Sequence, residues 1–239
     1  MKTLIVLQFY EGDKAQARRL TELMTWLETS KVESAGVLLA PRFDCCAEDE
    51  WVGQVARRFD VDVHVGRRRA YGWPFGPNEL WYDTTQWIYE SELFRRYDTA
   101  LFMEPDAVPL VPGWIPELQA AWRAAERPCV VMGHLHEYAA GRPHVNGNAM
   151  FSLDKSFLWS VVRKHGGNPA VGWDVEFAPI FFQQGARNTP LIRNLYAHPT
   201  IGKAEFEAQI MNGCVFLHGV KDLSVQQLVR ERVTQLRRA

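Results

Sequence analysis

The sequence predicts a single-domain α/β protein in which a mostly parallel, Rossmann-like central sheet is flanked by helices. Two observations support this fold class. Short apolar runs alternate with amphipathic helix patterns in the first half of the chain, an order that is typical of parallel sheets covered on both faces. The composition, 47% hydrophobic and 23% charged among 239 residues, is globular and excludes disordered and fibrous classes. No linker or internal repeat divides the chain.

Five apolar runs predict the strands of the first half. They are residues 4–7, 36–40, 61–65, 99–103 and 129–132. The run 61–65 alternates valines with Asp62 and His64, which indicates a half-exposed strand. Helices are expected where apolar residues recur every three or four positions: 14–27 with Asp13 as its N-cap, 51–59, 83–97 and 114–126. Residues 66–80, rich in Gly, Pro, Trp and Arg, predict a loop.

The second half is less regular. It contains a Gly/Asn/His-rich stretch, a helix pattern and two short strand patterns: 134–148, 154–165, 191–196 and 214–217. In an open α/β sheet, ligands bind at the carboxyl ends of the strands. Polar residues that directly follow a predicted strand are therefore the first candidates for a functional site.

Charge, hydropathy and cysteine usage limit the classes of protein that fit. Lys+Arg 27 against Asp+Glu 28 gives a net charge of −1, so a nucleic-acid contact would need a local basic patch. No run of about 18 apolar residues predicts a membrane span. The first residues form a strand pattern and not a secretion signal. Four cysteines without CxxC pairing predict free thiols, and we expect a cytoplasmic protein.

Two carboxylates follow the strand 99–103, at Glu104 and Asp106. With one residue between them, they project from the same side of an extended chain. Hard oxygen donors at this spacing suit Mg²⁺ or Mn²⁺ bound together with a substrate diphosphate. The alternative is a loop pair that caps the following helix.

A second polar group follows the strand 214–217. His218 and Lys221 flank Gly219. A neutral imidazole would supply a nitrogen ligand to the same cation, and an ammonium would neutralise phosphate charge. The alternatives are a buried histidine bonded to a carbonyl group and a solvated surface lysine.

With these motifs, the chain resembles nucleotide-sugar-dependent glycosyltransferases of the GT-A fold. The βαβ pattern of the first half, the segment 102–106 as a variant of the DxD motif, and the segment 218–221 as an HGxK-type element carry the resemblance, which covers most of the chain. It implies hexosyl transfer from a UDP-sugar, with Mn²⁺ or Mg²⁺ held by Asp106 and His218. It also implies a donor half over about 1–110 and an acceptor half over about 111–239. Glu104, which stands where the family usually has Asp, is assigned to the donor site and the metal site.

Other polar segments are assigned by residue chemistry together with the resemblance. Asn146 and Asn148 offer amide groups to the donor sugar, unless they form a turn between two strands. Gln8 and Tyr10 follow the first strand, where the fold receives the nucleotide base. Trp173 would contact the acceptor.

The resemblance also places an acidic element at the start of a helix under the acceptor. Within it we favour Asp174 over Glu176 as the general base. In a retaining enzyme, Asp174 would instead orient the acceptor or stabilise charge on the sugar ring. Helix capping by Asp174 is the alternative.

The acceptor is predicted from a basic and aromatic segment. Arg67 and Arg69 stand next to Trp73, and cations interleaved with aromatic rings suit a phosphate backbone with unstacked bases. Small transferases of this type resemble viral enzymes that glycosylate hydroxymethylated pyrimidines in DNA, which would place the protein in a host cytoplasm. A bacterial glycan or lipid-linked saccharide is the second acceptor hypothesis, and a solvated charged face is the alternative for the arginines.

Two further function classes compete. A nucleotidyltransferase needs a Gly-rich, basic phosphate loop after its first strand, and residues 8–13 have one Gly and no Arg. A non-catalytic carbohydrate- or nucleic-acid-binding module would lack metal-dependent nucleotide affinity. A second acid pair, Asp60 and Asp62, competes for the metal. Since Asp60 begins its strand, we expect this pair to be structural.

Overall fold

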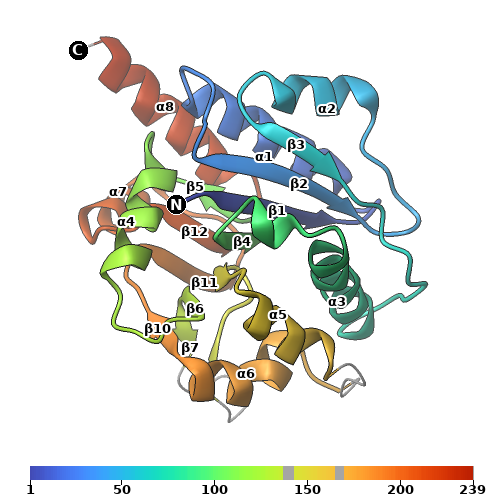
Figure 1. Cartoon of the computed structure of the whole chain (residues 1–239). Helices are drawn as coiled ribbons and strands as arrows, with labels where there is room; N and C mark the ends of the chain where they lie inside the picture. Colours follow the sequence, from blue (N-terminus) through green and yellow to red (C-terminus); the bar gives the residue numbers. More distant parts are fainter. Residues whose placement is uncertain (137–142, 165–169, 239) are drawn as a thin grey trace.

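The computed structural model describes residues 1–136, 143–164 and 170–238 (Figure 1). Apolar side chains alternate between the two faces of its central strands. On β1 (Thr3–Phe9), Ile5 and Leu7 belong to one buried cluster and Leu4 and Val6 to another. Both faces of the sheet are therefore buried, as the predicted fold class requires.

Within the described residues, seven strands form the central sheet, in the order β10-β6-β9-β4-β1-β2-β3. Their bounds, besides β1, are β2 Ala35–Pro41, β3 Asp60–Val63, β4 Thr99–Met103, β6 Val131–Gly133, β9 Met150–Ser152 and β10 Ala186–Asn188. β1 runs parallel to both β2 and β4, and β9 is antiparallel to β4 and β6. The sheet is mostly parallel, as predicted, and strands of both halves of the chain share it.

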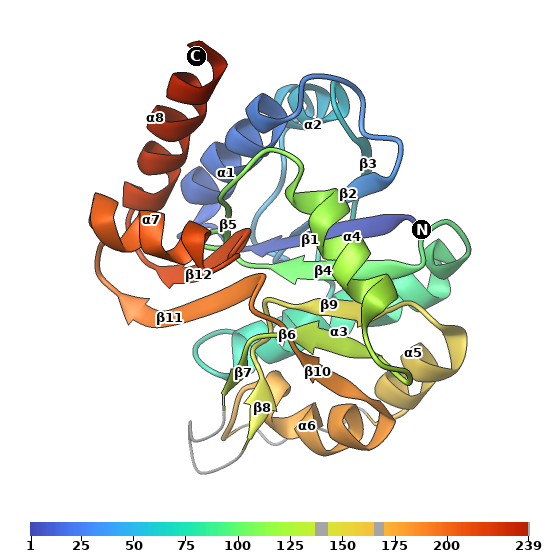
Figure 2. The ribbon, with the colours of Figure 1, turned by 90° about the vertical axis from the view of Figure 1, so that its left-hand side faces the viewer.

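Helices cover both faces of this sheet (Figures 1 and 2). One buried cluster includes residues of α1 Lys14–Leu27, α2 Asp49–Ala56, α4 Trp114–Ala124, α7 Lys203–Met211 and α8 Ser224–Arg238. The cluster on the other face includes residues of α3 Phe75–Glu90, η1 Leu93–Arg95, α5 Lys155–Val162 and α6 Trp173–Gln184.

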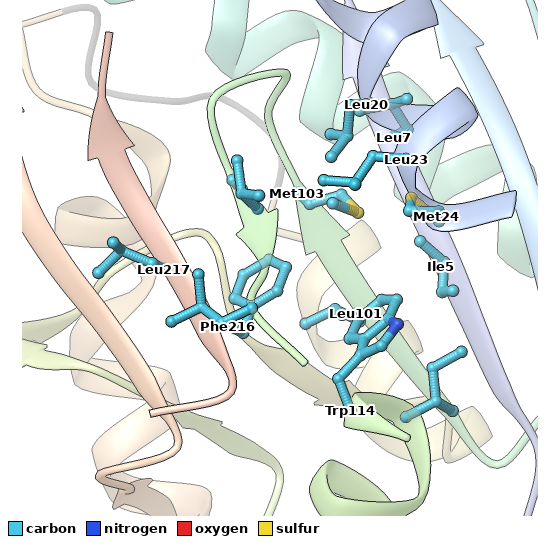
Figure 3. Close-up of a cluster of buried hydrophobic side chains, with 14 of the residues drawn as sticks. Ile5, Leu7, Leu20, Leu23, Met24, Leu101, Met103, Trp114, Phe216 and Leu217 are labelled. Atoms are coloured by element: carbon cyan, nitrogen blue, oxygen red, sulfur yellow. The ribbon is translucent and has the colours of Figure 1, made fainter. Parts of the chain in front are cut away.

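A second sheet places the end of the chain beside β4. It consists of β11 (Ile192–His198), β12 (Phe216–Val220) and β5 (Val108–Pro109), in the order β11-β12-β5. Figure 3 shows Phe216 and Leu217 of β12 in the same apolar cluster as the side chains of β4 and α4. This packing brings the segment after β12 next to the segment after β4. A separate pair, β7 (Leu135–His136) and β8 (His144–Val145), lies outside both sheets.

The structure corrects the predicted loop over 66–80 and the predicted helix over 83–97. α3 begins at Phe75, because Pro77 lies in its first turn, where a backbone N–H has no partner within the helix. The helix ends at Glu90, and Glu92 takes a left-handed conformation (φ 57°) before η1. Gly and Pro therefore mark the start of a helix here and not a continuous loop.

The structure also corrects the predicted pattern of the strand 61–65. The regular strand ends at Val63, and Val63 and Val65 are 39% and 43% exposed, while His64 is buried. β3 is an edge strand. His64 is buried because its imidazole pairs with a carboxylate of α3, as described below.

Other predicted boundaries shift by a few residues. The strand expected at 129–132 is β6, Val131–Gly133, and the patterns at 191–196 and 214–217 correspond to β11 and β12. The helix pattern 154–165 is α5, Lys155–Val162; its predicted end at His165, and part of the stretch 134–148, lie outside the described residues. The four cysteines are free thiols, as expected. In the described part of the chain, no helix has the length and apolarity to cross a membrane.

Candidate active site

A cleft of about 530 Å³ opens at the carboxyl ends of β1 and β4. Its walls come from the segments after these strands, from the region around the start of α3 and from the segment after β12. The lining includes the polar residues Gln8, Asp13, Glu104, Asp106 and Lys221 and the aromatic residues Tyr10, Trp73 and Trp173. The cleft thus lies where an open α/β sheet presents its ligands.

Glu104, Asp106 and His218 meet beside this cleft. His218 Nε2 lies 3.1 Å from Glu104 Oε2 and 3.3 Å from Asp106 Oδ1. The carboxylates follow β4 and the histidine is on β12, so the packing of the two sheets assembles the group. Among the described residues, this is the group of His, Cys, Asp and Glu side chains whose ligand atoms all lie within 4.8 Å of one another.

Opposite charges set the ionisation of this group. Burial lowers the pKa of His218, but the hydrogen bonds that its imidazole donates to Asp106 and Glu104 outweigh burial and raise the pKa to about 9. Burial also raises the pKa of the Asp106 carboxyl, yet His218 and Lys221 reverse this effect and lower the pKa to about 2. In the absence of a cation, Asp106 is therefore ionised and His218 protonated at neutral pH.

Lys221 and Asp13 are two further ionisable residues that line the cleft. Lys221 Nζ lies 2.6 Å from Asp106 Oδ2. Burial lowers the pKa of Lys221, and Asp106 more than compensates, so the pKa is raised. Asp13 is the N-cap residue of α1, as predicted, but its carboxylate accepts from Tyr10 N at 2.7 Å and not from the helix. Burial raises the pKa of Asp13 to about 7, with Glu104 and Asp106 contributing.

Local backbone geometry presents these side chains. Glu104 O accepts from Ala107 N at 2.9 Å, which closes a turn with Pro105 at its second position. Gly219 has φ +99°, and a Cβ there would lie 2.6 Å from Asn194 Oδ1 and 2.8 Å from Tyr196 N. Only glycine fits this position next to His218.

The donor set fits a hard divalent cation. Two carboxylates and one imidazole suit Mn²⁺ or Mg²⁺. His218 Nε2 faces both carboxylates, while its Nδ1 is buried with no hydrogen-bond partner in the described part of the chain. Nε2 is therefore the atom that would bind a cation, and the histidine would give up its Nε2 proton to do so.

Asn146 and Asn148, predicted to bind the donor sugar, do not line the cleft. Asn148 is 3% exposed, and its Oδ1 accepts from Glu104 N at 2.8 Å. Asn146 Oδ1 in turn accepts from Asn148 N at 3.0 Å. The segment is not the turn of a hairpin, since the flanking strands β8 and β9 pair with other strands.

Asp174 lies in the first turn of α6 and is largely buried behind the cleft wall, next to Trp173, which lines the cleft where Asp174 does not. Its Oδ1 accepts from Val175 N at 2.9 Å and its Oδ2 from Gly147 N at 3.2 Å, with His144 Nε2 at 4.0 Å. Gly172, not Asp174, is the N-cap residue of the helix. Burial raises the pKa of Asp174, and His144 opposes this rise.

The two predicted tryptophans have different surroundings. The ring of Trp173 stacks on Trp81 at 4.0 Å with an interplanar angle of 9°. The same ring packs against the backbone of Gly147, where an added Cβ would lie 2.6 Å from Trp173 Cζ2. Trp173 is thus held by packing. Trp73 is 78% exposed on the cleft wall, so its ring is accessible to a ligand.

The predicted arginines lie away from the cleft lining. Arg67 Nε lies 2.9 Å from Asp83 Oδ1, and Arg67 Nη1 lies 3.2 Å from Glu90 Oε2. Arg69 is exposed. The structure therefore does not bring Arg67 or Arg69 together with the other site residues.

The end of the cleft next to β1 and β2 contains a residue, Arg42, that sequence reasoning missed. Gln8 Nε2 donates to Thr84 Oγ1 at 3.0 Å. The guanidinium of Arg42 lies 5.0 Å from the ring centre of Tyr10 and 4.9 Å from that of Tyr71, and it pairs with Asp44 at 2.6 Å. Arg42 follows β2, so the rule about strand ends, applied to the second strand, would have found it.

No protein-family model matches the sequence, and no curated protein matches it. Solved structures of glycosyltransferases resemble it in fold at 11–12% identity. The bifunctional glycosyltransferase WbbM superimposes with a TM-score of 0.56 over 92% of this chain and 46% of that chain, at 12% identity. The glycosyltransferase GlyE of Streptococcus pneumoniae TIGR4 gives a TM-score of 0.57 over 98% and 64%, at 12% identity. The chain shares its fold with these glycosyltransferases.

A third structure matches over its whole length. A glycosyltransferase involved in the glycosylation of the major capsid of PBCV-1 gives a TM-score of 0.53 at 11% identity, over 98% of this chain and 100% of that chain. The chain thus spans less than two thirds of WbbM and GlyE but the full length of this structure. These likenesses confirm the predicted fold class, a mostly parallel α/β sheet of the GT-A type.

Proposed function

We propose that this protein is a metal-dependent glycosyltransferase that moves a hexose from a UDP-sugar to an acceptor hydroxyl. The observation that supports this proposal most strongly is the meeting of Glu104, Asp106 and His218 at a cleft in a glycosyltransferase fold. Two carboxylates and an imidazole from distant elements have little structural reason to share a partly open site. A cation that binds a diphosphate would account for all three.

Asp106 and His218 would hold Mn²⁺ or Mg²⁺, with Glu104 as the third ligand. The bound ion would supply positive charge to the diphosphate, which becomes more negative as the bond to the sugar breaks. Lys221 carries a second positive charge at the same place, 2.6 Å from Asp106. It would bind a phosphate oxygen directly.

The donor nucleoside would occupy the end of the cleft after β1 and β2. There Tyr10 is 45% exposed and Gln8 lines the wall, so a ring for stacking and an amide for hydrogen bonding are both available. We propose that they bind the uracil base. Residues 1–110 would thus form most of the donor side, with Lys221 contributed by the second half.

We assign the role of general base to Asp174. Its burial raises the pKa of its carboxyl, which makes the carboxylate a stronger proton acceptor at neutral pH. In an inverting reaction it would take the proton of the acceptor hydroxyl. In a retaining reaction it would orient the acceptor or stabilise charge on the sugar ring.

For the acceptor, we favour a saccharide over a hydroxymethylated pyrimidine in DNA. The ion pairs of Arg67 and Arg68 with Asp83 and Glu79 cancel charge that a phosphate backbone would need. The exposed ring of Trp73 on the cleft wall suits stacking against a sugar ring.

Incubation with a panel of UDP-sugars, Mn²⁺ and acceptors, followed by mass spectrometry, tests this function. The acceptors are oligosaccharides, lipid-linked saccharides and hydroxymethylated DNA. We expect transfer to a saccharide, with loss of transfer on addition of EDTA. Transfer to DNA alone would overturn the acceptor assignment, and calorimetry showing no Mn²⁺-dependent affinity for UDP would favour a non-catalytic binding module.

A further inference from the structure

The antiparallel contact between β4 and β9 continues past the end of β4 through a side chain. Phe102 N donates to Ala149 O at 3.0 Å. Two residues later, Glu104 N donates to the side-chain Oδ1 of Asn148 at 2.8 Å, where a regular ladder would use a backbone carbonyl. The backbone N–H of the first acid of the pair is therefore held by an asparagine from another segment.

The orientation of this amide is determined by its second contact. Asn148 Nδ2 donates to Asn146 Oδ1 at 3.3 Å, and the same oxygen accepts from Asn148 N at 3.0 Å. With the amino group directed to Asn146, Oδ1 faces Glu104 N. At 3% exposure, Asn148 has no access to a ligand in the cleft.

The Glu104 side chain needs such support. It is 49% exposed and has three rotatable bonds, and its carboxylate pairs with His218 Nε2 at 3.1 Å. Its backbone is held at two points, by Asn148 at the N–H and by Ala107 at the carbonyl. Without the first bond, only the bond to Ala107 holds the backbone from which the carboxylate reaches His218.

We propose that Asn148 is a positioning residue for the cation site: it holds the backbone of Glu104 so that the carboxylate lies beside Asp106 and His218. Asn146 orients the Asn148 amide and so acts on the cation site only through Asn148. This inference rests on the proposed function, because it takes the three residues as cation ligands. Partners of this kind, one bond away from a metal ligand, typically change metal affinity about 10- to 100-fold.

The test is Mn²⁺ binding by the full chain without nucleotide, measured by calorimetry and by the electron paramagnetic resonance of free Mn²⁺. We expect Asn148→Ala to weaken binding about 10-fold. Asn78→Ala is the matched control. Asn78 Oδ1 also accepts a hydrogen bond from a backbone N–H, that of Trp173, with a length of 2.8 Å, but this bond does not involve the acids. This control should bind Mn²⁺ like the wild type. Thermal unfolding verifies that each variant is folded.

A double-mutant cycle separates positioning from general damage. If Asn148 acts through Glu104, Asn148→Ala has no further effect on Mn²⁺ affinity in a Glu104→Ala background. Should Asn148→Ala fail to fold, Asn146→Ala is measured in the same cycle, with a smaller loss expected in the same direction. Full additivity with Glu104→Ala, or wild-type affinity in both asparagine variants, would overturn the inference alone. A wild type that binds Mn²⁺ no better than Asp106→Ala would overturn both the inference and the proposed cation site.

Discussion

The chain contains two acid-x-acid motifs, and they differ in where their strands place them. Asp60 and Asp62 lie at the start of β3 and along it. Asp60 pairs with Lys31 at 2.9 Å and Asp62 with Arg96 at 3.1 Å, on the surface. Glu104 and Asp106 follow the carboxyl end of β4, beside a cleft, and they share His218.

Each motif also has a histidine, and the two histidines have different surroundings. His64 follows the first motif and is buried, with Nε2 2.9 Å from Asp83 Oδ2 and its ring stacked on Trp87 at 4.8 Å. Asp83 also accepts from Arg67 N at 2.9 Å, so this pair anchors the segment that leads to Trp73. Burial raises the pKa of Asp83, but His64 and Arg67 outweigh it, and the pKa is lowered.

The spacing of two acids therefore does not by itself identify a cation site. In the first motif each acid has its own cation, and the histidine is used for structure. In the second, several acids gather around one histidine and one lysine at the end of the sheet where ligands bind. Four predictions test this difference between the two motifs.

The largest effect is expected for Asp106→Ala. Loss of this ligand removes the positive charge that the cation brings to the diphosphate, so transfer should fall about 1000-fold, the equivalent of about 4 kcal/mol. Mn²⁺ should no longer raise the melting temperature. Asp62→Ala, measured by the same transfer assay and melting curves, should retain both properties. Equal losses in the two variants would remove the distinction between the motifs.

The two histidines should separate metal binding from stability. His218→Gln should weaken Mn²⁺ affinity at least about 10-fold, because the cation loses its nitrogen ligand. His64→Gln should leave Mn²⁺ affinity unchanged and lower the free energy of unfolding by about 1–3 kcal/mol, since the buried Asp83 loses a partner. Calorimetry and urea unfolding give the two quantities. An unchanged Mn²⁺ affinity in His218→Gln would contradict the site.

The burial of Asp13 beside the acids of the cleft predicts a stability that falls as pH rises, the opposite of the pH dependence expected for the first motif. The pKa of Asp13 rises to about 7 on folding from its ordinary value of 3.8, so the folded state binds its proton more tightly. Its contribution to stability is therefore present at low pH and lost as pH rises from about 4 to about 7.

Asp13→Asn, which keeps an oxygen for Tyr10 N, should raise the melting temperature of the metal-free protein at pH 8 by about 2–4 °C. The difference between the variant and the wild type should shrink toward pH 4. A gain at pH 4 that equals the gain at pH 8 would exclude titration of Asp13 as the cause.

The smallest effect, with the opposite sign, is expected for Asp60→Asn. The hydrogen-bonded salt bridge to Lys31 lowers the pKa of Asp60, so the contribution of Asp60 to stability is present above its ordinary pKa and lost as pH falls. An exposed pair of this kind contributes less than about 1 kcal/mol, so the variant should be slightly less stable at pH 7. Urea unfolding at pH 7 and at low pH measures it, and a gain in stability would contradict the pairing.

Local patterns in the sequence predicted much of the fold and the centre of the site. Short continuous apolar runs located β1, β2 and β4, and the position of Glu104 and Asp106 after a strand located the cleft. The patterns failed where a distant partner decides the outcome. His64 looked like the exposed face of a strand because Asp83, its partner, lies 19 residues further on, and Arg67 looked free for a ligand for the same reason.

Periodicity and neighbours along the chain are enough to predict most strands and helices and the polar residues at strand ends, because these features are local. Only the tertiary structure decided that β12 packs beside β4, so that His218 reaches the acids, and that Asn148 is buried against the backbone of Glu104. The physical reason is that such contacts depend on strand order and register, which join residues more than 40 positions apart.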